Sequence, residues 1–293
     1  MTAGLRRRLL ASFARRPSAG SWALVSPALL WLLLFFAVPL ALLLGYSLMH
    51  RGTYGGVSPG FTLEHYRRFV DPLYLAVAGR TLGIALATTA LCLLLGYPVA
   101  YGIARAGRWR NALLFLVILP FWTSFLVRTY AMIVLLRESG VFNAVLQGLG
   151  VISAPLDLLY TPGAVLAGLV YGFLPFMILP IYASLERLDL SLLDAAEALG
   201  ARPAARFRRV TLPLSLPGVA AGSLLVFIPA LGSFLTPDLL GGAKTMMLGN
   251  LVQNQFGPAR NWPFGAAISF ALMGVVFVAL LAWLRVRDRE AAA

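Results

Sequence analysis

DAAEALGARPAARFRRVTLP, residues Asp194–Pro213, is a polar stretch between two long apolar segments. Apolar residues recur there at helical spacing, at Leu192, Leu193, Ala196 and Leu199. Gly200 follows where a left-handed helix cap is expected, and Pro203 suits the first turn of a second short helix that carries arginines. We predict a helix–turn–helix whose apolar stripe needs burial. A partner protein can provide it, and packing on the chain's own bundle is the alternative.

The composition is that of a membrane protein. The chain has 293 residues, of which 60% are hydrophobic and 12% are charged, whereas soluble domains average about 45–50% apolar and about 25% charged. Backbone hydrogen bonding restricts membrane spans to helices or a closed barrel. The apolar segments are long and continuous, so we predict an all-α integral membrane protein.

Six apolar segments exceed or approach the ~20 residues that cross a bilayer. They are 22–49, 72–103, 112–136, 162–185, 217–235 and 264–284. We therefore expect a basic tail at 1–21, one membrane domain at 22–285 with a cytoplasmic loop at 186–216, and a tail at 286–293.

Basic residues predict the orientation. Sixteen of the 24 Lys and Arg residues lie in the two tails, the loop near residue 107 and the loop around Gly200, whereas six lie in the opposite loops. The positive-inside rule then places both termini in the cytoplasm. The net charge of +13 follows this topology and suits contact with anionic lipids, so we expect no nucleic-acid partner.

Catalytic and cofactor motifs are missing from the sequence. The segment Gly241–Thr245 differs from a phosphate-binding loop because Ala243 separates the glycines from Lys244. No zinc-protease motif or Cys/His cluster occurs, and the two histidines, His50 and His65, are expected to be solvated. We expect no cofactor, no metal and no enzymatic activity in this chain.

The spacing of the polar stretch is similar to a known motif. Asp194-Ala195-Ala196 is followed after three residues by Gly200, and after nine more by V-T-L-P ending at Pro213. This resembles the EAA loop of bacterial ABC-transporter permeases (EAA, three residues, Gly, nine residues, I-x-L-P), with Asp for Glu and Val for Ile. In that family the loop is gripped by the cytoplasmic ATPase.

Further strings narrow the resemblance. GYPVAY at Gly96–Tyr101, LPFWTS at Leu119–Ser124, DLLGGAK at Asp238–Lys244 and NWPFGAA at Asn261–Ala267 look like the first permease subunit of spermidine/putrescine importers. The resemblance implies a type I importer fold with six transmembrane helices in the bacterial inner membrane. It also implies a homologous second permease subunit, an ATPase dimer and a periplasmic or lipid-anchored solute-binding protein as partners.

Three sets of candidate residues follow. For coupling to the ATPase they are Asp194, Ala195, Ala196, Gly200 and Pro213. A polyamine pathway needs carboxylates and aromatic faces, and the candidates are Asp238, Trp122, Tyr130, Tyr171 and Phe234. Arg128 lies inside an apolar span, where an arginine is costly, so we expect a structural or gating role with carbonyls or a partner's acid.

Each candidate has a simpler interpretation. Asp238 could cap a helix or lie in a solvated loop, and the aromatic residues could face lipid or the core. Pro213 could simply begin a helix, and Arg128 could extend to the outer interface.

An alternative function is that of an ABC importer permease for another small solute, such as an organic amine, an amino-acid derivative or a phosphonate. A secondary transporter is disfavoured because the spans lack central carboxylates.

Overall fold

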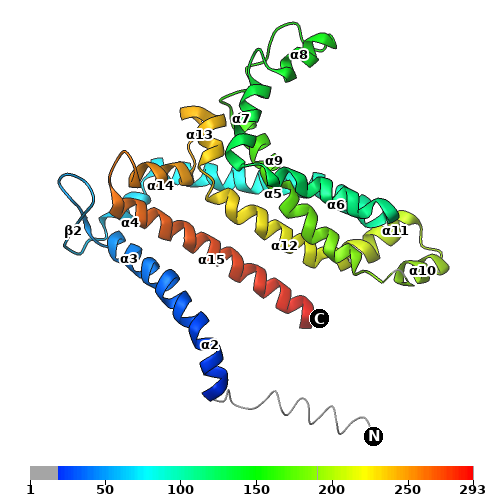
Figure 1. Ribbon diagram of the computed structural model, residues 1–293, viewed down its shortest axis with the longest axis horizontal. Helices are drawn as coiled ribbons and strands as arrows, with labels where there is room; N and C mark the ends of the chain where they lie inside the picture. Colours follow the sequence, from blue (N-terminus) through cyan, green and yellow to red (C-terminus); the bar gives the residue numbers. More distant parts are fainter. Residues whose placement is uncertain (1–18, 190, 293) are drawn as a thin grey trace.

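The computed structural model describes residues 19–189 and 191–292, which are mainly helical (Figure 1). The chain begins with α2 (Ala19–Leu32), the π-helical turn η1 (Leu33–Ala37), α3 (Val38–Ser47), the antiparallel pair β1 (His50–Arg51) and β2 (Val57–Ser58), and α4 (Glu64–Phe69). It continues with α5 (Pro72–Arg105), η2 (Gly107–Trp109), α6 (Arg110–Ile118), η3 (Leu119–Trp122), α7 (Phe125–Leu136), α8 (Val141–Gly148) and α9 (Pro162–Glu186). The remainder is α10 (Ser191–Ala198), α11 (Pro203–Arg206), η4 (Phe207–Thr211), α12 (Leu212–Leu231), α13 (Leu235–Gly241), η5 (Gly242–Lys244), α14 (Leu248–Phe256) and α15 (Trp262–Ala292).

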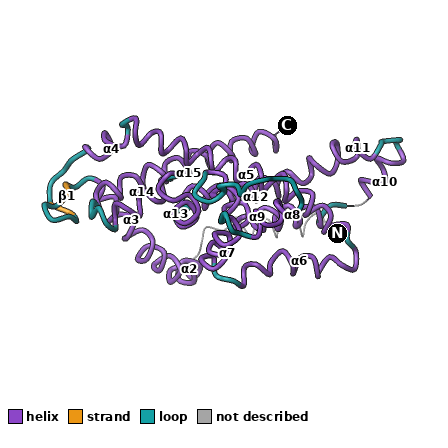
Figure 2. The backbone as a smooth tube through the Cα atoms, turned by 90° about the horizontal axis from the view of Figure 1, so that it is seen from above, coloured by secondary structure: helices purple, strands orange, loops and turns teal. Residues whose placement is uncertain are grey.

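Helices α5, α9 and α12 form the centre of the bundle (Figure 1; Figure 2). Among the described residues, helix α9 supplies more buried apolar side chains than any other helix, including Leu169, Met177 and Ile181. Two glycines of α12 allow close approach. A Cβ atom at Gly218 would lie 2.6 Å from the carbonyl oxygen of Pro180, and one at Gly222 would lie 2.9 Å from the sulfur of Met177. Small residues at such contacts are the usual means of packing transmembrane helices.

The prediction of helical membrane spans is confirmed. Within the described residues, five helical segments are long and apolar enough to cross a membrane, and a shorter apolar helical stretch covers Trp262–Val278 of α15. The first segment, Val25–Ser47, contains the π-helical turn η1 just before Pro39. Its apolar side chains from Leu29 to Phe36 are exposed in the isolated chain, so lipid or another subunit must cover them.

The third predicted span, 112–136, is not one continuous helix. It consists of α6 and α7, joined by the tight turn η3 and by extended backbone at Thr123 and Ser124. Pro120 lies in the first turn of η3 and has no N–H to continue the ladder from α6. The break turns α7 away from α6 (Figure 1), and the long apolar segment in this region is Phe125–Gly148 across α7 and α8.

The fifth predicted span, 217–235, is displaced toward its amino-terminal end. Helix α12 begins at Leu212 and ends at Leu231, and a non-helical connection through Ser233 leads to α13. The expectation of a solvated His65 is wrong. Its side chain is buried beside Phe264, and Nε2 lies 3.0 Å from the carbonyl oxygen of Met49.

Candidate functional site

The polar loop begins with a well-capped helix. The N–H of Ser191 donates to Oδ1 of Asp189 at 2.9 Å, and this hydrogen bond lowers the pKa of the exposed Asp189 carboxyl. At the other end of α10, the N–H of Gly200 donates to the carbonyl of Glu197 (2.8 Å) and that of Ala201 to the carbonyl of Ala196 (3.0 Å). Gly200 has a φ of +79°. This is a Schellman motif, and the predicted left-handed cap is confirmed.

The second helix of the loop starts at Pro203, as predicted, but it is not a separate short helix. Helix α11 continues through the π-helical turn η4 into α12 without a break. The helical segment Pro203–Leu231 therefore extends from the loop into the fifth span as one body. The loop and α12 are therefore joined by unbroken helix.

Phe207 attaches this loop to the bundle. Its ring makes edge-on contacts with Tyr97 and Tyr101 of α5, each with ring centroids 5.7 Å apart. The hydroxyl of Tyr97 lies 2.8 Å from Oγ of Ser215 on α12. These contacts hold α5 and α12 together just above the loop. Sequence reasoning did not single out Phe207, although it is the one aromatic residue of Asp194–Pro213.

The predicted apolar stripe is only partly covered by the chain, since Leu193 and Ala196 are half-buried. Leu199 is 88% exposed and Leu192 is 46% exposed, so the interpretation that the loop buries its stripe on its own bundle is wrong for these two residues.

The candidate coupling residues share this exposed surface. Asp194 and Ala195 are exposed and Ala196 is half-buried, whereas Pro213 is exposed in the first turn of α12. Across the turn, Arg206 forms an ion pair with Glu197. Among the described residues, Asp194 forms no ion pair.

A hollow of about 600 Å³ at the end of α7 brings two pathway candidates together. Tyr130 of α7 and Asp238 of α13 both line it. The same hollow is lined by Tyr160 and Arg137, neither of which was predicted to belong to the pathway. Its lining residues come from α7 and the residue that follows it, from α13 and from the segment just before α9, and α7 and α13 lie well apart from α10 (Figure 1).

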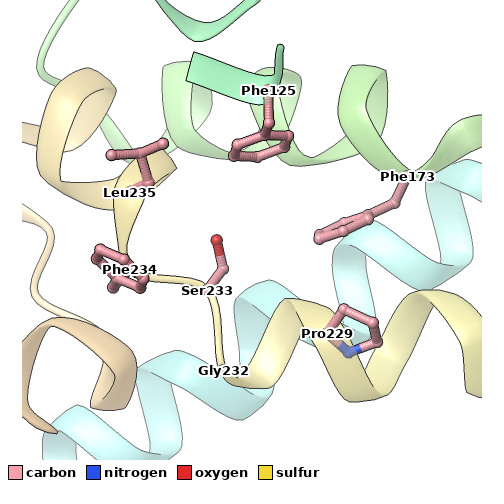
Figure 3. Close-up of a pocket in the computed structure, with 7 residues that line it drawn as sticks. All are labelled: Phe125, Phe173, Pro229, Gly232, Ser233, Phe234 and Leu235. Atoms are coloured by element: carbon pink, nitrogen blue, oxygen red, sulfur yellow. The ribbon is translucent and has the colours of Figure 1, made fainter. Parts of the chain in front are cut away.

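Phe234 lies in a second, apolar hollow of about 310 Å³. Figure 3 shows the hydroxyl of Ser233 pointing into it, with Phe125 of α7 and Phe173 of α9 on the opposite side. Trp122 and Tyr171 line neither hollow. Trp122 is 74% exposed and packs edge-on against Phe115, and Tyr171 is exposed on α9.

Arg128 lies in an aromatic environment. Its guanidinium carbon is 5.5 Å from the ring centroids of both Phe121 and Phe125, a geometry for cation–π attraction. Nε and Nη1 are buried, and no acceptor among the described residues satisfies them. The expected pairing with carbonyls of this chain is therefore absent for these two atoms, which leaves them available to an external acceptor.

The described residues contain no group of three His, Cys, Asp or Glu side chains that could hold a metal ion. The carboxylate of Asp238 and the guanidinium of Arg137 line the larger hollow together with the rings of Tyr130 and Tyr160. The second hollow is lined by phenylalanine rings and the hydroxyl of Ser233.

The comparisons with known proteins agree with this architecture. The family described as "Binding-protein-dependent transport system inner membrane component" matches residues 92–287, and the chain belongs to this family. Its members are the transport permeases of ABC importers.

A relative and two solved structures illustrate the match. The Escherichia coli K12 protein named spermidine/putrescine transport system permease protein PotB is 45% identical, over 87% of this chain and 93% of the relative. A bacterial ABC transporter for the polysaccharide alginate has the same fold, with a TM-score of 0.68 at 18% identity over 92% of this chain and 94% of the other. A second structure of an alginate transporter, in complex with an alginate-bound periplasmic protein, gives 0.67 at 19% identity over 89% of this chain and 91% of the other.

Proposed function

We propose that this chain is the permease subunit of an ABC importer that carries the polyamines spermidine and putrescine across the inner membrane. The observation that carries the proposal is the 45% identity, over nearly the whole length of both chains, to a permease named for these solutes. The hollow lined by Asp238, Tyr130 and Tyr160 supports it, since ammonium groups are bound by carboxylates and aromatic faces.

The proposed transporter needs three kinds of partner. A homologous permease subunit covers the exposed apolar side chains of the first span, and a solute-binding protein docks at the α13–α14 end. A dimer of ATPase subunits grips α10, where Leu192, Leu199 and Asp194 are exposed. Both termini are then cytoplasmic, in accord with the distribution of basic residues.

The proposed mechanism starts at the coupling loop. Closure of the ATPase dimer displaces α10 and, through the Schellman turn at Gly200, the helix that begins at Pro203. Because this helix is continuous with α12 and Phe207 contacts α5, both central helices move. The spans pass from an inward-facing to an outward-facing arrangement, and solute enters from the binding protein.

Reconstitution tests the proposal. The complex of this chain with its cognate partners, in proteoliposomes, should hydrolyse ATP faster with polyamine-loaded binding protein than with empty binding protein, and it should import labelled putrescine and spermidine. Asp238→Asn should reduce import more than assembly, because the change removes charge and nearly preserves shape.

Asp157→Asn, at an exposed outer-loop carboxylate, is the matched control and should transport normally. If another small solute stimulates hydrolysis and is imported while polyamines do neither, the substrate assignment is wrong and the assignment to the importer family stands.

A further inference from the structure

Tyr160 has an unusual backbone conformation for a large aromatic residue. Its φ is +59°, in the left-handed region that favours glycine. The backbone on both sides is fixed by Thr161, whose hydroxyl donates to the carbonyl of Leu158 (2.8 Å) and accepts from the N–H of Ala164 (3.1 Å). Such strain persists where the surrounding structure holds it, and it is concentrated at functional sites.

The ring of Tyr160 lies against Gly242. A Cβ atom at Gly242 would be 3.0 Å from Cδ1 and 3.4 Å from Cγ of Tyr160. Gly242 itself has a φ of +53°, so both its conformation and its contact with the ring require glycine. Gly242 follows α13, the helix that carries Asp238. The string DLLGGAK thus supplies both a carboxylate and the surface on which the ring rests.

Three groups in this hollow have the chemistry of an amine site. Asp238 provides a carboxylate, and Tyr130 and Tyr160 provide aromatic rings. Among the described residues, Asp238 has no ion-pair partner, although Arg137 lines the same hollow. A carboxylate without a cation and two rings attract an alkylammonium head. Of the described residues that line the hollow, Asp238 is the one carboxylate and can neutralise one ammonium group, while the guanidinium of Arg137 repels any further cation, so we expect one head of a linear amine to bind at a time.

We propose that Tyr160, seated on Gly242, forms with Asp238 and Tyr130 a subsite for one ammonium head of a linear alkylamine in transit. The proposal rests on the proposed function and names a residue and a binding mode within it. The ring acts through its face, and the left-handed backbone places it there.

Tyr160→Gly tests the role of the ring without threatening the fold, because glycine adopts a φ of +59° without strain. The complete complex in proteoliposomes should assemble in normal yield, and ATP hydrolysis stimulated by the loaded binding protein should persist. Initial uptake of labelled putrescine and spermidine should fall about tenfold. Tyr160→Phe keeps the ring face and should retain at least half of the wild-type uptake.

Gly242→Ala should lower uptake like Tyr160→Gly, because the added Cβ displaces the ring. Gly150→Ala is its control, since Gly150 has a comparable φ of +68° and a Cβ there meets nothing within 4 Å. If Tyr160→Gly imports both amines at the wild-type rate, or if Tyr160→Phe is as impaired as Tyr160→Gly, the ring-face subsite is overturned.

Competition by butyrate, a linear carboxylate without an ammonium group, provides a further test with the wild-type complex. If it displaces putrescine from the complex as well as putrescine itself does, Arg137 binds a carboxylate and the ammonium assignment fails. If the wild-type complex imports neither amine, the proposed function fails and the subsite with it. Normal wild-type import with an unaffected Tyr160→Gly variant removes only the subsite.

Discussion

Replacing Phe207 with alanine should uncouple ATP hydrolysis from transport. The substitution removes two edge-on aromatic contacts, to Tyr97 and Tyr101 of α5. Each such pair contributes about 0.5–1.5 kcal/mol beyond burial of its area, so the loss weakens attachment of the loop to α5 by about 1–3 kcal/mol. Since about 1.4 kcal/mol corresponds to a factor of ten, the equilibrium between attached and detached loop shifts toward the detached state by roughly 5- to 150-fold.

In the proposed mechanism, a loop that no longer holds α5 would still contact the ATPase through the exposed surface of α10. The ATPase subunits then close and hydrolyse ATP while α5 follows incompletely. We expect Phe207→Ala to assemble with its partners and to retain hydrolysis, while the number of solutes imported per ATP falls at least about fivefold. The measurement is simultaneous ATP hydrolysis and solute uptake in proteoliposomes.

Two variants control this experiment. Phe207→Leu keeps apolar volume and loses the ring edge, and it should fall between wild type and Phe207→Ala. Phe61→Ala changes an outer-loop phenylalanine that is 73% exposed, and it should behave as wild type. An unchanged ratio of solute to ATP in Phe207→Ala, at normal complex yield, would refute the role of this contact.

Three further predictions concern the loop, the buried arginine and the orientation. Gly200→Val places a β-branched residue at a φ of +79°, a conformation that costs about 1–2 kcal/mol. The variant protein should insert into the membrane normally but co-purify with less ATPase. Unchanged co-purification would contradict the coupling role. Arg128→Met deletes buried nitrogens that have no acceptor in the described chain, so its melting temperature in detergent should be retained while transport by the complex falls. A fall in melting temperature would instead assign Arg128 to packing. A cysteine at Ala201 in a Cys92→Ala background should resist an impermeant thiol reagent added outside cells, and labelling there would reverse the predicted orientation.

The local features of the fold were predictable from sequence because local physics determines them. A long apolar run must become a helix in lipid, since the backbone has no other hydrogen-bond partners there. The turn at Gly200 and the helix start at Pro203 were predicted from the conformations that glycine and proline favour, and both are confirmed.

The interruption of the third span was not predictable in the same way. Prolines at 98, 175, 180, 217 and 229 all remain inside helices, whereas Pro120 lies in a break. The difference depends on whether neighbouring elements satisfy the freed carbonyls, which is a tertiary property. The end of α12 at Leu231 was missed because the apolar run resumes at Phe234 and Leu235 after only Gly232 and Ser233.

The candidate site was predicted in part. Charge and aromatic character selected Asp238 and Tyr130, and the structure places them in one hollow. The same criteria selected Trp122 and Tyr171, which lie elsewhere, because residue type does not say which face of a helix a ring occupies. Tyr160 was missed because a left-handed tyrosine has no sequence signal of its own; its only trace is the second glycine of DLLGGAK, at Gly242.

The packing of the central helices explains how a loop at one end of the bundle can affect a hollow at the other. At Gly218 the backbone of α12 approaches that of α9 so closely that even a Cβ would meet the carbonyl of Pro180, and the same holds at Gly222 against Met177. Interiors packed this closely resist sliding, so α12 and α9 move together. The close contact between α12 and α9 ends where α12 ends, at the non-helical connection through Ser233. The hollow in Figure 3 lies at this connection. In the proposed mechanism, a displacement that enters at Phe207 would therefore be relieved at the wall of the apolar hollow, which Phe234 lines.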